Sequence, residues 1–358
     1  SVLFTTTNTK HIQTFSLAVY CVIIVVGTVG NGLVIYVTGF KMKKTVNSVW
    51  FLNLALADFL FTAFLVFTAV SLSQKHHWPF GQSMCKLNNF VSLVNMFASV
   101  FFLMVINLDR CLSTWVVAWA QNERTVFKAQ IISAVIWFAA GICSTPSACF
   151  RIVTYQDNDT QCVYNATMQQ KRSLYTFRFV VGFLIPFLVI FLSYVAIGIR
   201  SKRLQNVRKH LSHRLIVFII VAFFICWLPF HVMSFIDLAS SNKQDLKKIV
   251  KIGGPLTVSL AFTNSCLNPI LYVFMCDEFQ KKLKQSIWLV LENALAEDHI
   301  SFVTLSRSMS RIPRKSDSTG PLNFILLHCT TEKVDQSYTC SLQKKIIQLL
   351  YIKKLIYS

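Results

Sequence analysis

Long apolar blocks separated by short polar segments make up most of the chain. A bilayer core of about 30 Å is crossed by a helix of about 20 apolar residues, so blocks of that length predict membrane spans. They run from Ser16 to Gly39, Val49 to Leu72, Ser83 to Leu112, Ala129 to Ile152, Ser173 to Ile199, Leu215 to Leu238 and Gly253 to Met275. The pattern predicts an all-α membrane protein, a seven-transmembrane helix bundle.

The composition agrees with lipid as the solvent. Hydrophobic residues make up 54% of the chain and charged residues 14%, and the mean hydropathy is +0.53, whereas an ordinary soluble domain has roughly 25% charged residues. This composition excludes a disordered chain. The formal net charge of +20 raises the question of nucleic-acid binding, but the basic residues lie between the apolar blocks, so we expect no nucleic-acid partner.

The distribution of basic residues predicts the orientation in the membrane. Lys and Arg concentrate in the loops on one side of the predicted bundle, which include Lys41, Arg124 and Arg200. Because the more basic side of a membrane protein is cytoplasmic, we expect the N-terminus to be extracellular.

Four parts of the chain follow from this orientation. Phe279, Leu283 and Ile287 stand four residues apart among lysines, which predicts an amphipathic helix on the cytoplasmic surface of the lipid. The tail beyond it is rich in Ser, Thr and Arg and is predicted to be largely disordered. The parts are an extracellular segment (1–15), the bundle (16–275), the surface helix (277–290) and the cytoplasmic tail (291–358).

A short set of polar residues lies inside the predicted spans, where each must face the bundle interior because polar groups are costly in hydrocarbon. The set is Asn31, Asp58, Asn95, Ser99, Arg178, Asn264, Ser265 and Asn268. Asp58 is the only carboxylate deep in any predicted span, and with hydroxyls and amides on neighbouring helices it suits a small hard cation such as sodium. The alternative is a structural hydrogen-bond network that only ties the helices together.

Prolines and a charged pair indicate a conformational switch. Pro186, Pro229 and Pro269 lie inside the fifth, sixth and seventh spans, where proline removes a backbone hydrogen bond and permits a kink. Asp109 and Arg110 stand at the cytoplasmic end of the third span; alone, such a pair is more typical of a solvated helix end. In a bundle without internal repeats, kinked helices favour a switch over a rigid pore.

The outer loops carry covalent features of an extracellular face. Cys85 opens the third span and Cys162 lies in the loop after the fourth, and both occupy an oxidising compartment, so we expect a disulfide that fastens this loop over the bundle. Asn158 and Asn165 begin glycosylation sequons in the same loop.

Together, motifs on successive spans resemble the signature set of rhodopsin-like (class A) G-protein-coupled receptors from about Ser16 to about His299. They are Asn31 in GTVGN, Asp58 in LNLALAD, Asp109-Arg110-Cys111, Trp137, Pro186 with Tyr194, Cys226-Trp227-Leu228-Pro229 and Asn268-Pro269-Ile270-Leu271-Tyr272. Within this family, Trp119-Ala120-Gln121-Asn122 and Asn264-Ser265-Cys266 resemble the chemoattractant group of chemerin and formyl-peptide receptors. Arg178-Phe179 and the third-span string Asn88-Asn89-Phe90 are more similar to the chemerin receptor.

The resemblance implies roles for individual residues, all of which are expectations at this point. The implied sodium ligands are Asp58, Asn95, Ser99, Asn264, Ser265 and Asn268, and this favours the sodium site over the purely structural network. The implied ligand-binding residues are Asn89, Ser92, Arg178 and Trp227, the last also acting as a rotamer switch. The implied activation and G-protein-coupling residues are Asp109, Arg110, Tyr194, Pro229, Pro269 and Tyr272.

Several residues depart from the family pattern. Formyl-peptide receptors resemble one another in an Asp where Leu93 stands and an Arg where Leu174 stands, so recognition of formyl-Met is not expected. Val117 replaces the usual Pro of the second inner loop, and Trp115 is unusual nearby, which weakens the expectation of G-protein coupling.

Arg178 has two interpretations. It could snorkel to the outer interface, but an intramembrane Arg without a partner is costly, so we favour contact with a ligand carboxylate.

The sequence therefore predicts a plasma-membrane peptide receptor that couples to a Gi-type G protein and, through its Ser/Thr-rich tail, to arrestin. The expected ligand is a peptide or small protein, acidic or with a C-terminal carboxylate, because the outer loops are positive. A decoy receptor that binds ligand without G-protein activation is the alternative. A transporter is disfavoured by the lack of repeats. An enzyme is disfavoured because the spans lack a nucleophile–base set or a metal cluster, and we expect no cofactor besides sodium.

Overall fold

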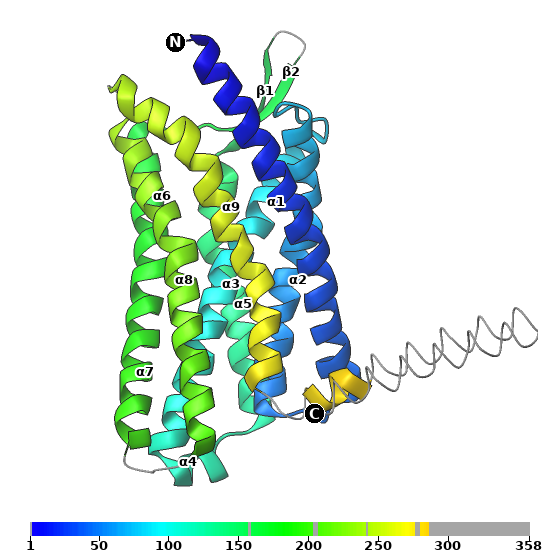
Figure 1. The fold of residues 1–358 in the computed structure, drawn as a ribbon, viewed down its shortest axis with the longest axis vertical. Helices are drawn as coiled ribbons and strands as arrows, with labels where there is room; N and C mark the ends of the chain where they lie inside the picture. Colours follow the sequence, from blue (N-terminus) through cyan, green and yellow to red (C-terminus); the bar gives the residue numbers. More distant parts are fainter. Residues whose placement is uncertain (1, 157–158, 203–206, 241–242, 276–279, 286–358) are drawn as a thin grey trace, which may run out of the picture. The chain divides into compact units, whose positions relative to one another are not determined.

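The computed structural model describes residues 2–156, 159–202, 207–240, 243–275 and 280–285. Long helices run side by side and form a bundle (Figure 1). They are α1 (Val2–Tyr36), α2 (Val46–Ser73), α3 (Gly81–Trp115), α4 (Val117–Asn122), α5 (Val126–Cys149), α6 (Met168–Phe179), α7 (Ile185–Lys202), α8 (Val207–Ala239) and α9 (Gln244–Met275). Two π-helical segments, η1 (Val37–Lys41) and η2 (Val180–Leu184), continue α1 and join α6 to α7.

Six helical segments among the described residues are long and apolar enough to cross a membrane. They are His11–Lys41, Val46–Ser73, Gly81–Trp115, Val126–Cys149, Met168–Arg200 and Val221–Ala239. The seventh predicted span lies in α9, which packs against α1 and α8 within the same bundle. The predicted spans therefore correspond to helices of one bundle.

Some bounds of the predicted spans were wrong. The fourth span was expected to reach Ile152, but α5 ends at Cys149 and Ile152 belongs to strand β1 (Arg151–Gln156). This strand pairs antiparallel with β2 (Asp159–Tyr164), so its backbone groups bond in a hairpin instead of a helix. The prediction of an all-α chain thus missed one hairpin. The seventh helix begins at Gln244, before the predicted Gly253, because charged residues continue it beyond its apolar part.

Capping residues determine where α2 and α5 begin. Both helices begin a few residues before the apolar blocks that predicted them. Thr45 precedes α2 and accepts a hydrogen bond from the Ser48 backbone N–H at 3.1 Å, while the Ser48 hydroxyl accepts one from the Thr45 N–H at 2.8 Å. This reciprocal pair is a capping box, which satisfies two otherwise unpaired donors. Thr125 caps α5 in a similar way by accepting from the Lys128 N–H.

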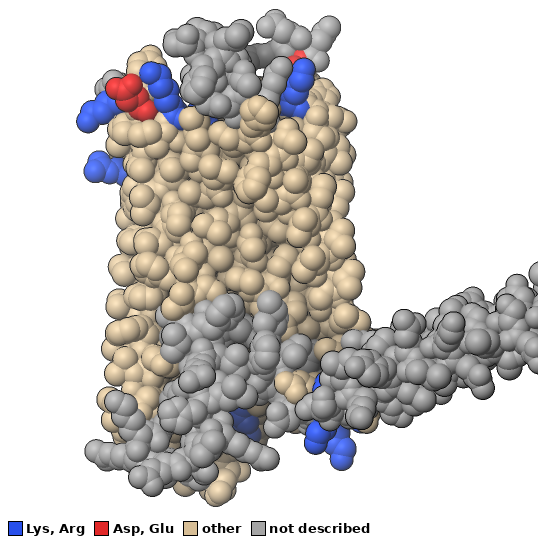
Figure 2. Space-filling model, viewed as in Figure 1, with Lys and Arg blue, Asp and Glu red and all other residues tan. Residues whose placement is uncertain are grey.

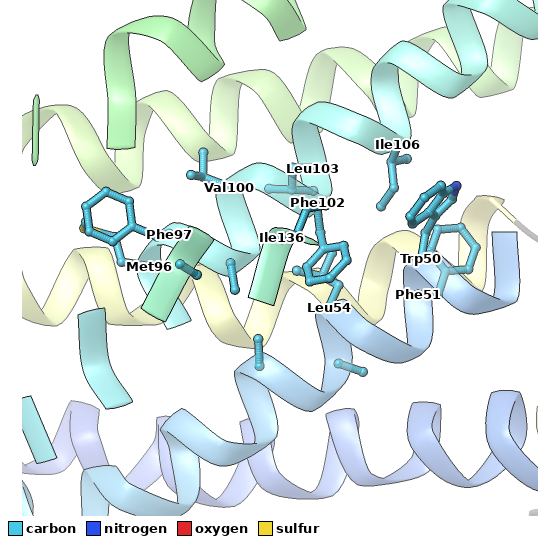
Figure 3. Packing of buried hydrophobic residues seen from close by; sticks show 14 of the residues in the cluster. Trp50, Phe51, Leu54, Met96, Phe97, Val100, Phe102, Leu103, Ile106 and Ile136 are labelled. Carbon is cyan, nitrogen blue, oxygen red and sulfur yellow. The ribbon is translucent and has the colours of Figure 1, made fainter. Parts of the chain in front are cut away.

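The centre of the core lies between α2, α3 and α5 (Figure 3). Leu54 of α2, Phe102 of α3 and Ile136 of α5 are buried there, and the Phe102 and Trp137 rings meet edge to face at 6.2 Å. A second cluster joins α1 to α2 and α9, with Phe61 and Phe262 in edge contact at 4.8 Å. These contacts fix the helices that carry the buried polar residues.

The surface separates charged from apolar residues. On the face shown in Figure 2, Lys and Arg lie near both ends of the bundle, Asp and Glu are visible near one end, and the uncovered middle contains other residue types. Large apolar side chains such as Val25, Phe138 and Leu192 are exposed. An apolar band of this kind matches a lipid environment.

Parts of the predicted cytoplasmic segment lie outside the described residues. Residues 280–285 are helical, and Leu283 packs partly buried against the core of the bundle. The rest of the predicted surface helix 277–290 and the predicted tail 291–358 lie outside the described residues, so both stay predictions. For brevity, the end of the bundle that carries the β1–β2 hairpin is called the hairpin end, and the end that carries α4 is called the far end (Figure 1).

Candidate functional site

The structure brings most of the predicted sodium ligands into one hydrogen-bonded group in the middle of the bundle. Asn268 donates from Nδ2 to Asp58 Oδ2 at 2.6 Å, and the Ser99 hydroxyl lies 3.2 Å from Asp58 Oδ1. The same hydroxyl lies 3.1 Å from Asn95 Oδ1, and Asn95 Nδ2 donates to Ser265 Oγ at 3.0 Å. These five residues, from α2, α3 and α9, are all buried.

This group fits a small hard cation. It offers carboxylate, amide and hydroxyl oxygens around one buried negative charge, the donor type that such cations prefer. Within the described residues, none of the ion pairs of the structure involves Asp58. Asn264 is buried beside Ser265 but does not join these hydrogen bonds. Asp58, Asn95, Ser99 and Ser265 are the residues that would hold sodium, which would neutralise the Asp58 carboxylate.

Asn31 extends the group and was not assigned a role from the sequence beyond its motif. Its Nδ2 donates to the carbonyl oxygens of Gly27 at 2.9 Å and of Ser265 at 3.0 Å. The second bond ties α1 to the backbone of α9 next to the Asp58 group. A further polar link joins Trp137 Nε1 of α5 to Asn53 Oδ1 of α2 at 2.9 Å.

A cavity of about 840 Å³ lies between the helices toward the hairpin end. This volume is within the range of roughly 300–1,000 Å³ that small-ligand sites occupy. All four residues predicted to bind ligand line it: Asn89, Ser92, Arg178 and Trp227. Arg151 and Lys251 also line the cavity, whereas no Asp or Glu is among the described residues that do so. The cavity is therefore suited to a negatively charged ligand.

Arg178 lies among aromatic rings instead of carboxylates. Its guanidinium is 5.2 Å from the ring centroid of Tyr175 and 5.5 Å from that of Phe230. Tyr175 in turn donates from its hydroxyl to Asp237 Oδ2 at 3.3 Å. No acidic residue in the described part of the chain forms an ion pair with Arg178. The cation–π contacts orient the side chain but leave its charge without an acidic counterpart.

Arg151 is a cavity residue that sequence reasoning missed. It is the first residue of β1; its guanidinium lies 4.8 Å from the Tyr164 ring and donates from Nη1 to the Cys162 carbonyl at 3.4 Å. Its Nε is buried with no partner among the described residues. Burial lowers the pKa of Arg151, Tyr164 counteracts this, and the nearby positive charge of Arg178 lowers it further. Its place at the outer end of the fourth predicted span, before a loop that carries a cysteine, was the available signal.

The hairpin covers this end of the bundle and is attached at several points. The predicted disulfide between Cys85 and Cys162 is present, with a Cα–Cα distance of 5.7 Å, and joins α3 to β2. The Trp78 backbone N–H donates to the Thr160 carbonyl at 2.6 Å. His77 Nδ1 lies 2.6 Å from Asp159 Oδ1, and hydrogen bonds from Gln161 and His77 lower the pKa of Asp159.

The two glycosylation candidates lie in or after this hairpin. Asn165 is exposed directly after β2, and its backbone N–H donates to the Phe150 carbonyl at 2.8 Å. Asn158 lies outside the described residues. Glycosylation at either position stays a prediction.

Sequence reasoning also missed a buried histidine, His231, which contacts the cavity-lining rings of Trp227 and Phe230. His231 of α8 is enclosed by the rings of Phe179, Phe183, Trp227 and Phe230, with centroid distances between 5.2 and 6.3 Å. Its Nε2 has no partner among the described residues. The π-helical segment η2 ends at Leu184, two residues before Pro186, which has no N–H to donate to the Gly182 carbonyl four residues earlier. Phe179 and Phe183 of this region connect the α6–η2 segment to the helix of the predicted switch residue Trp227.

At the far end, Asp109 is paired with a residue other than its neighbour in sequence. Arg124 donates from Nε to Asp109 Oδ1 at 2.9 Å and from Nη2 to Oδ2 at 2.7 Å, and Nη2 also reaches Asn47 Oδ1 at 2.6 Å. This bidentate pair joins the ends of α2 and α3 to the segment before α5. Arg110 remains half-buried on α3.

The other predicted switch residues lie on three helices. Tyr194 is half-buried on α7, while Pro229 and Pro269 stand inside α8 and α9, which continue through them. Tyr272 belongs to α9, but its side chain is outside the described part. Trp115 donates from Nε1 to the Ala196 carbonyl at 3.1 Å, so it connects α3 to α7.

The chain belongs to the 7 transmembrane receptor (rhodopsin family), whose profile matches residues 30–272. It is a multi-pass plasma-membrane receptor of the chemoattractant group and not an enzyme. A relative from Sus scrofa, Chemerin-like receptor 1, is 37% identical over 84% of this chain and 90% of its own length. The human protein of that name is 39% identical over 79% of this chain and 80% of its own length. The C3a anaphylatoxin chemotactic receptor of Danio rerio is 39% identical over 82% of this chain and 81% of its own length.

Proposed function

We propose that this receptor binds a peptide or small-protein chemoattractant through a free C-terminal carboxylate and activates a Gi-type G protein. The observation that carries the proposal is the cavity lined by Arg151 and Arg178 without an acidic residue in its described lining. A guanidinium forms two parallel hydrogen bonds with a carboxylate, which a neutral C-terminal amide cannot match. The names of the relatives, with chemerin and C3a, support protein ligands of this kind.

Signalling would proceed by a shift between bundle conformations. A ligand that binds one conformation better than the other increases the population of that conformation by its differential affinity. The Phe230 ring of α8 contacts both Arg178 and Trp227, and it offers a route of contact from the cavity to α8. Asp109 is paired with Arg124, and we propose that the next residue, Arg110, contacts the G protein. The hairpin end would then be extracellular and the far end, with the tail that binds arrestin, cytoplasmic.

The test is nucleotide exchange on Gi in membranes that contain the receptor. Chemerin, C3a and their C-terminal peptides are added, each peptide as the free acid and as the amide, beside formyl-Met peptides. We expect exchange with at least one free acid, at least tenfold weaker potency for its amide, and no response to formyl peptides because Leu93 and Leu174 replace the polar residues expected for them.

Two variants make the test specific. Arg178→Ala should reduce the potency of the free acid about tenfold or more and leave the amide unchanged, because it removes the partner of the carboxylate. Arg172→Ala is the matched control, since Arg172 is exposed on the same helix and does not line the cavity. Equal potency of acid and amide on the wild type would contradict the carboxylate proposal, and binding without nucleotide exchange would indicate the decoy function instead.

A further inference from the structure

The first turns of α9 and the residue before them carry several lysines, and one of them differs from the rest in its position. Lys243, Lys247, Lys248 and Lys251 stand here with Asp245 as the acidic residue among them. Lys248 Nζ lies 3.5 Å from Asp245 Oδ1, so these two charges compensate each other at the surface. Lys251 lines the 840 Å³ cavity and forms no ion pair with a described residue.

Lys251 and Arg178 line the cavity from different helices. Lys251 is on α9, which packs against α1 and α8, and Arg178 is on α6, which packs against α8 and η2. Phe262 of α9 meets the Tyr20 ring of α1 at 5.6 Å, and both rings line the cavity. One carboxylate is far smaller than a cavity of this volume, so a ligand in it has room to present a second acidic group.

A buried hydroxyl of α1, which packs against the helix of Lys251, also lines the cavity. Ser16 of α1 is 1% exposed and lines the cavity, and its Oγ has no hydrogen-bond partner among the described residues. Ser16 and Tyr20 are four residues apart and therefore share one face of α1. A buried hydroxyl without a partner is costly. A ligand acceptor at this position would satisfy it.

We propose that Lys251 and Ser16 form a second carboxylate subsite, so that the receptor recognises a peptide by two acidic groups. The inference rests on the proposed function: the C-terminal carboxylate binds Arg151 and Arg178, and an Asp or Glu side chain upstream of it binds Lys251 and Ser16. An ammonium supplies charge and a hydroxyl supplies a directed donor, a combination that binds a carboxylate but gains little from a neutral amide. The ligand class is thus a peptide with an internal acidic residue and a free C-terminus.

A synthetic library of nine-residue peptides tests this subsite. One position at a time carries Glu or Gln, and every peptide is made as the free acid and as the amide. On the wild-type receptor we expect one upstream position at which Glu binds about tenfold more tightly than Gln, in the free-acid series. This preference should disappear in Lys251→Gln and decrease in Ser16→Ala.

The matched control is Lys248→Gln, which changes a lysine of the same helix that does not line the cavity. It should retain the preference for Glu. Lys251→Glu should reverse it, so that Gln at the same peptide position binds better than Glu. The preference for free acid over amide should remain in Lys251→Gln, which shows that the variant is folded and that the first subsite is intact.

The outcomes separate the two proposals. A preference for free acid without any preference for Glu, or a Glu preference that survives Lys251→Gln, would overturn the second subsite and leave the proposed function standing. Equal binding of acids and amides on the wild type would overturn the carboxylate recognition on which both rest. Failure of every library peptide to bind would also count against both.

Discussion

Three charged side chains inside the bundle are stabilised in three different ways. Asp58 accepts hydrogen bonds from an amide and a hydroxyl, Asp109 is held by a guanidinium, and Arg178 lies against two aromatic rings. A buried charge costs free energy unless it is paired or hydrogen-bonded, so each arrangement indicates a different use. The Asp109 pair is complete in itself, whereas Asp58 and Arg178 retain charge that a ligand or ion can neutralise.

At Asp58 we expect sodium to oppose peptide binding. Peptide affinity should fall about fivefold or more when sodium chloride replaces choline chloride at equal ionic strength, because an ion that prefers one conformation weakens ligands of the other by the coupling free energy. Asp58→Asn should abolish this dependence, since the amide keeps the shape of the side chain and loses its charge. Radioligand binding measures the effect, with Glu123→Gln as a control on an exposed carboxylate. A sodium dependence that persists in Asp58→Asn would favour a purely structural network.

At Asp109 we expect the pair with Arg124 to contribute to stability. Breaking a buried ion pair costs roughly 3–5 kcal/mol, and because Arg124 is 24% exposed we expect a smaller loss of about 2 kcal/mol for Arg124→Ala. The midpoint of thermal unfolding of the detergent-purified receptor measures it. Lys128→Ala is the control, because its pair with Glu123 is exposed on both sides and should contribute almost nothing. Equal midpoints for the two variants would show that Asp109 does not depend on Arg124.

At the scale of elements, small residues allow α1 to approach its neighbours. A Cβ atom added to Gly27 would lie 2.5 Å from Thr62 Cγ2 of α2 and 3.4 Å from Cys266 Sγ of α9. Thr62 is fully buried and its Oγ1 donates to the Phe59 carbonyl, so its methyl group has little freedom to move. Close approach at glycine is a common device in membrane bundles.

Gly27→Ala should therefore destabilise the bundle by about 1–3 kcal/mol, the usual cost of overpacking. Gly141→Ala on α5 is the matched control, because no atom lies within 4 Å of an added Cβ there. It should be neutral or slightly stabilising, since alanine is the better helix former. The midpoints of thermal unfolding of the two variants and the wild type measure these effects. A loss at Gly141 as large as that at Gly27 would refute the packing explanation.

At the scale of the whole bundle, the hairpin attached to α3 determines which groups border the cavity. Arg151 begins β1 and Cys162 lies in β2, so the disulfide to Cys85 holds cationic and strand residues over the helices. The hydrogen bond between Trp78 and Thr160 supplements this attachment. The site thus combines side chains of α1, α2, α3, α6, α8 and α9 with those of a hairpin.

Cys162→Ser should weaken peptide binding about tenfold or more and lower the unfolding midpoint, because the loop that carries Arg151 loses its covalent attachment. Cys149→Ser is the control, since Cys149 is a free, exposed cysteine at the end of α5. Saturation binding with the most potent free-acid peptide measures the effect. Unchanged affinity in Cys162→Ser would mean that the noncovalent contacts suffice to position the hairpin.

Much of this architecture could be predicted from the sequence. Apolar blocks long enough to span a membrane identify the helices, because in lipid every backbone group must be bonded within its own segment. The same cost of burying polar groups singled out Asp58, Asn95, Ser99, Ser265 and Asn268, which meet in the structure. The disulfide followed from the positions of two cysteines on one side of the membrane.

Residues whose role depends on distant neighbours could not be assigned in this way. The sequence alone indicates only that Arg151 and Lys251 are charges of the outer loops, and the folded chain places both at the cavity. Asp109 stands beside Arg110 in sequence, yet its partner is Arg124. The hairpin was missed because its pairing depends on backbone hydrogen bonds between segments, which apolar periodicity does not report.

The sequence by itself determined the class of solvent, the helices and their order, and the buried polar residues, because these depend on the transfer of individual side chains and backbone groups from water to lipid. Only the tertiary structure decided which charges are compensated and which are not, because an ion pair depends on distances between helices that are far apart in the chain. Asp109 is paired with the Arg124 guanidinium, whereas Arg178 and Lys251 border the cavity without an acidic partner among the described residues.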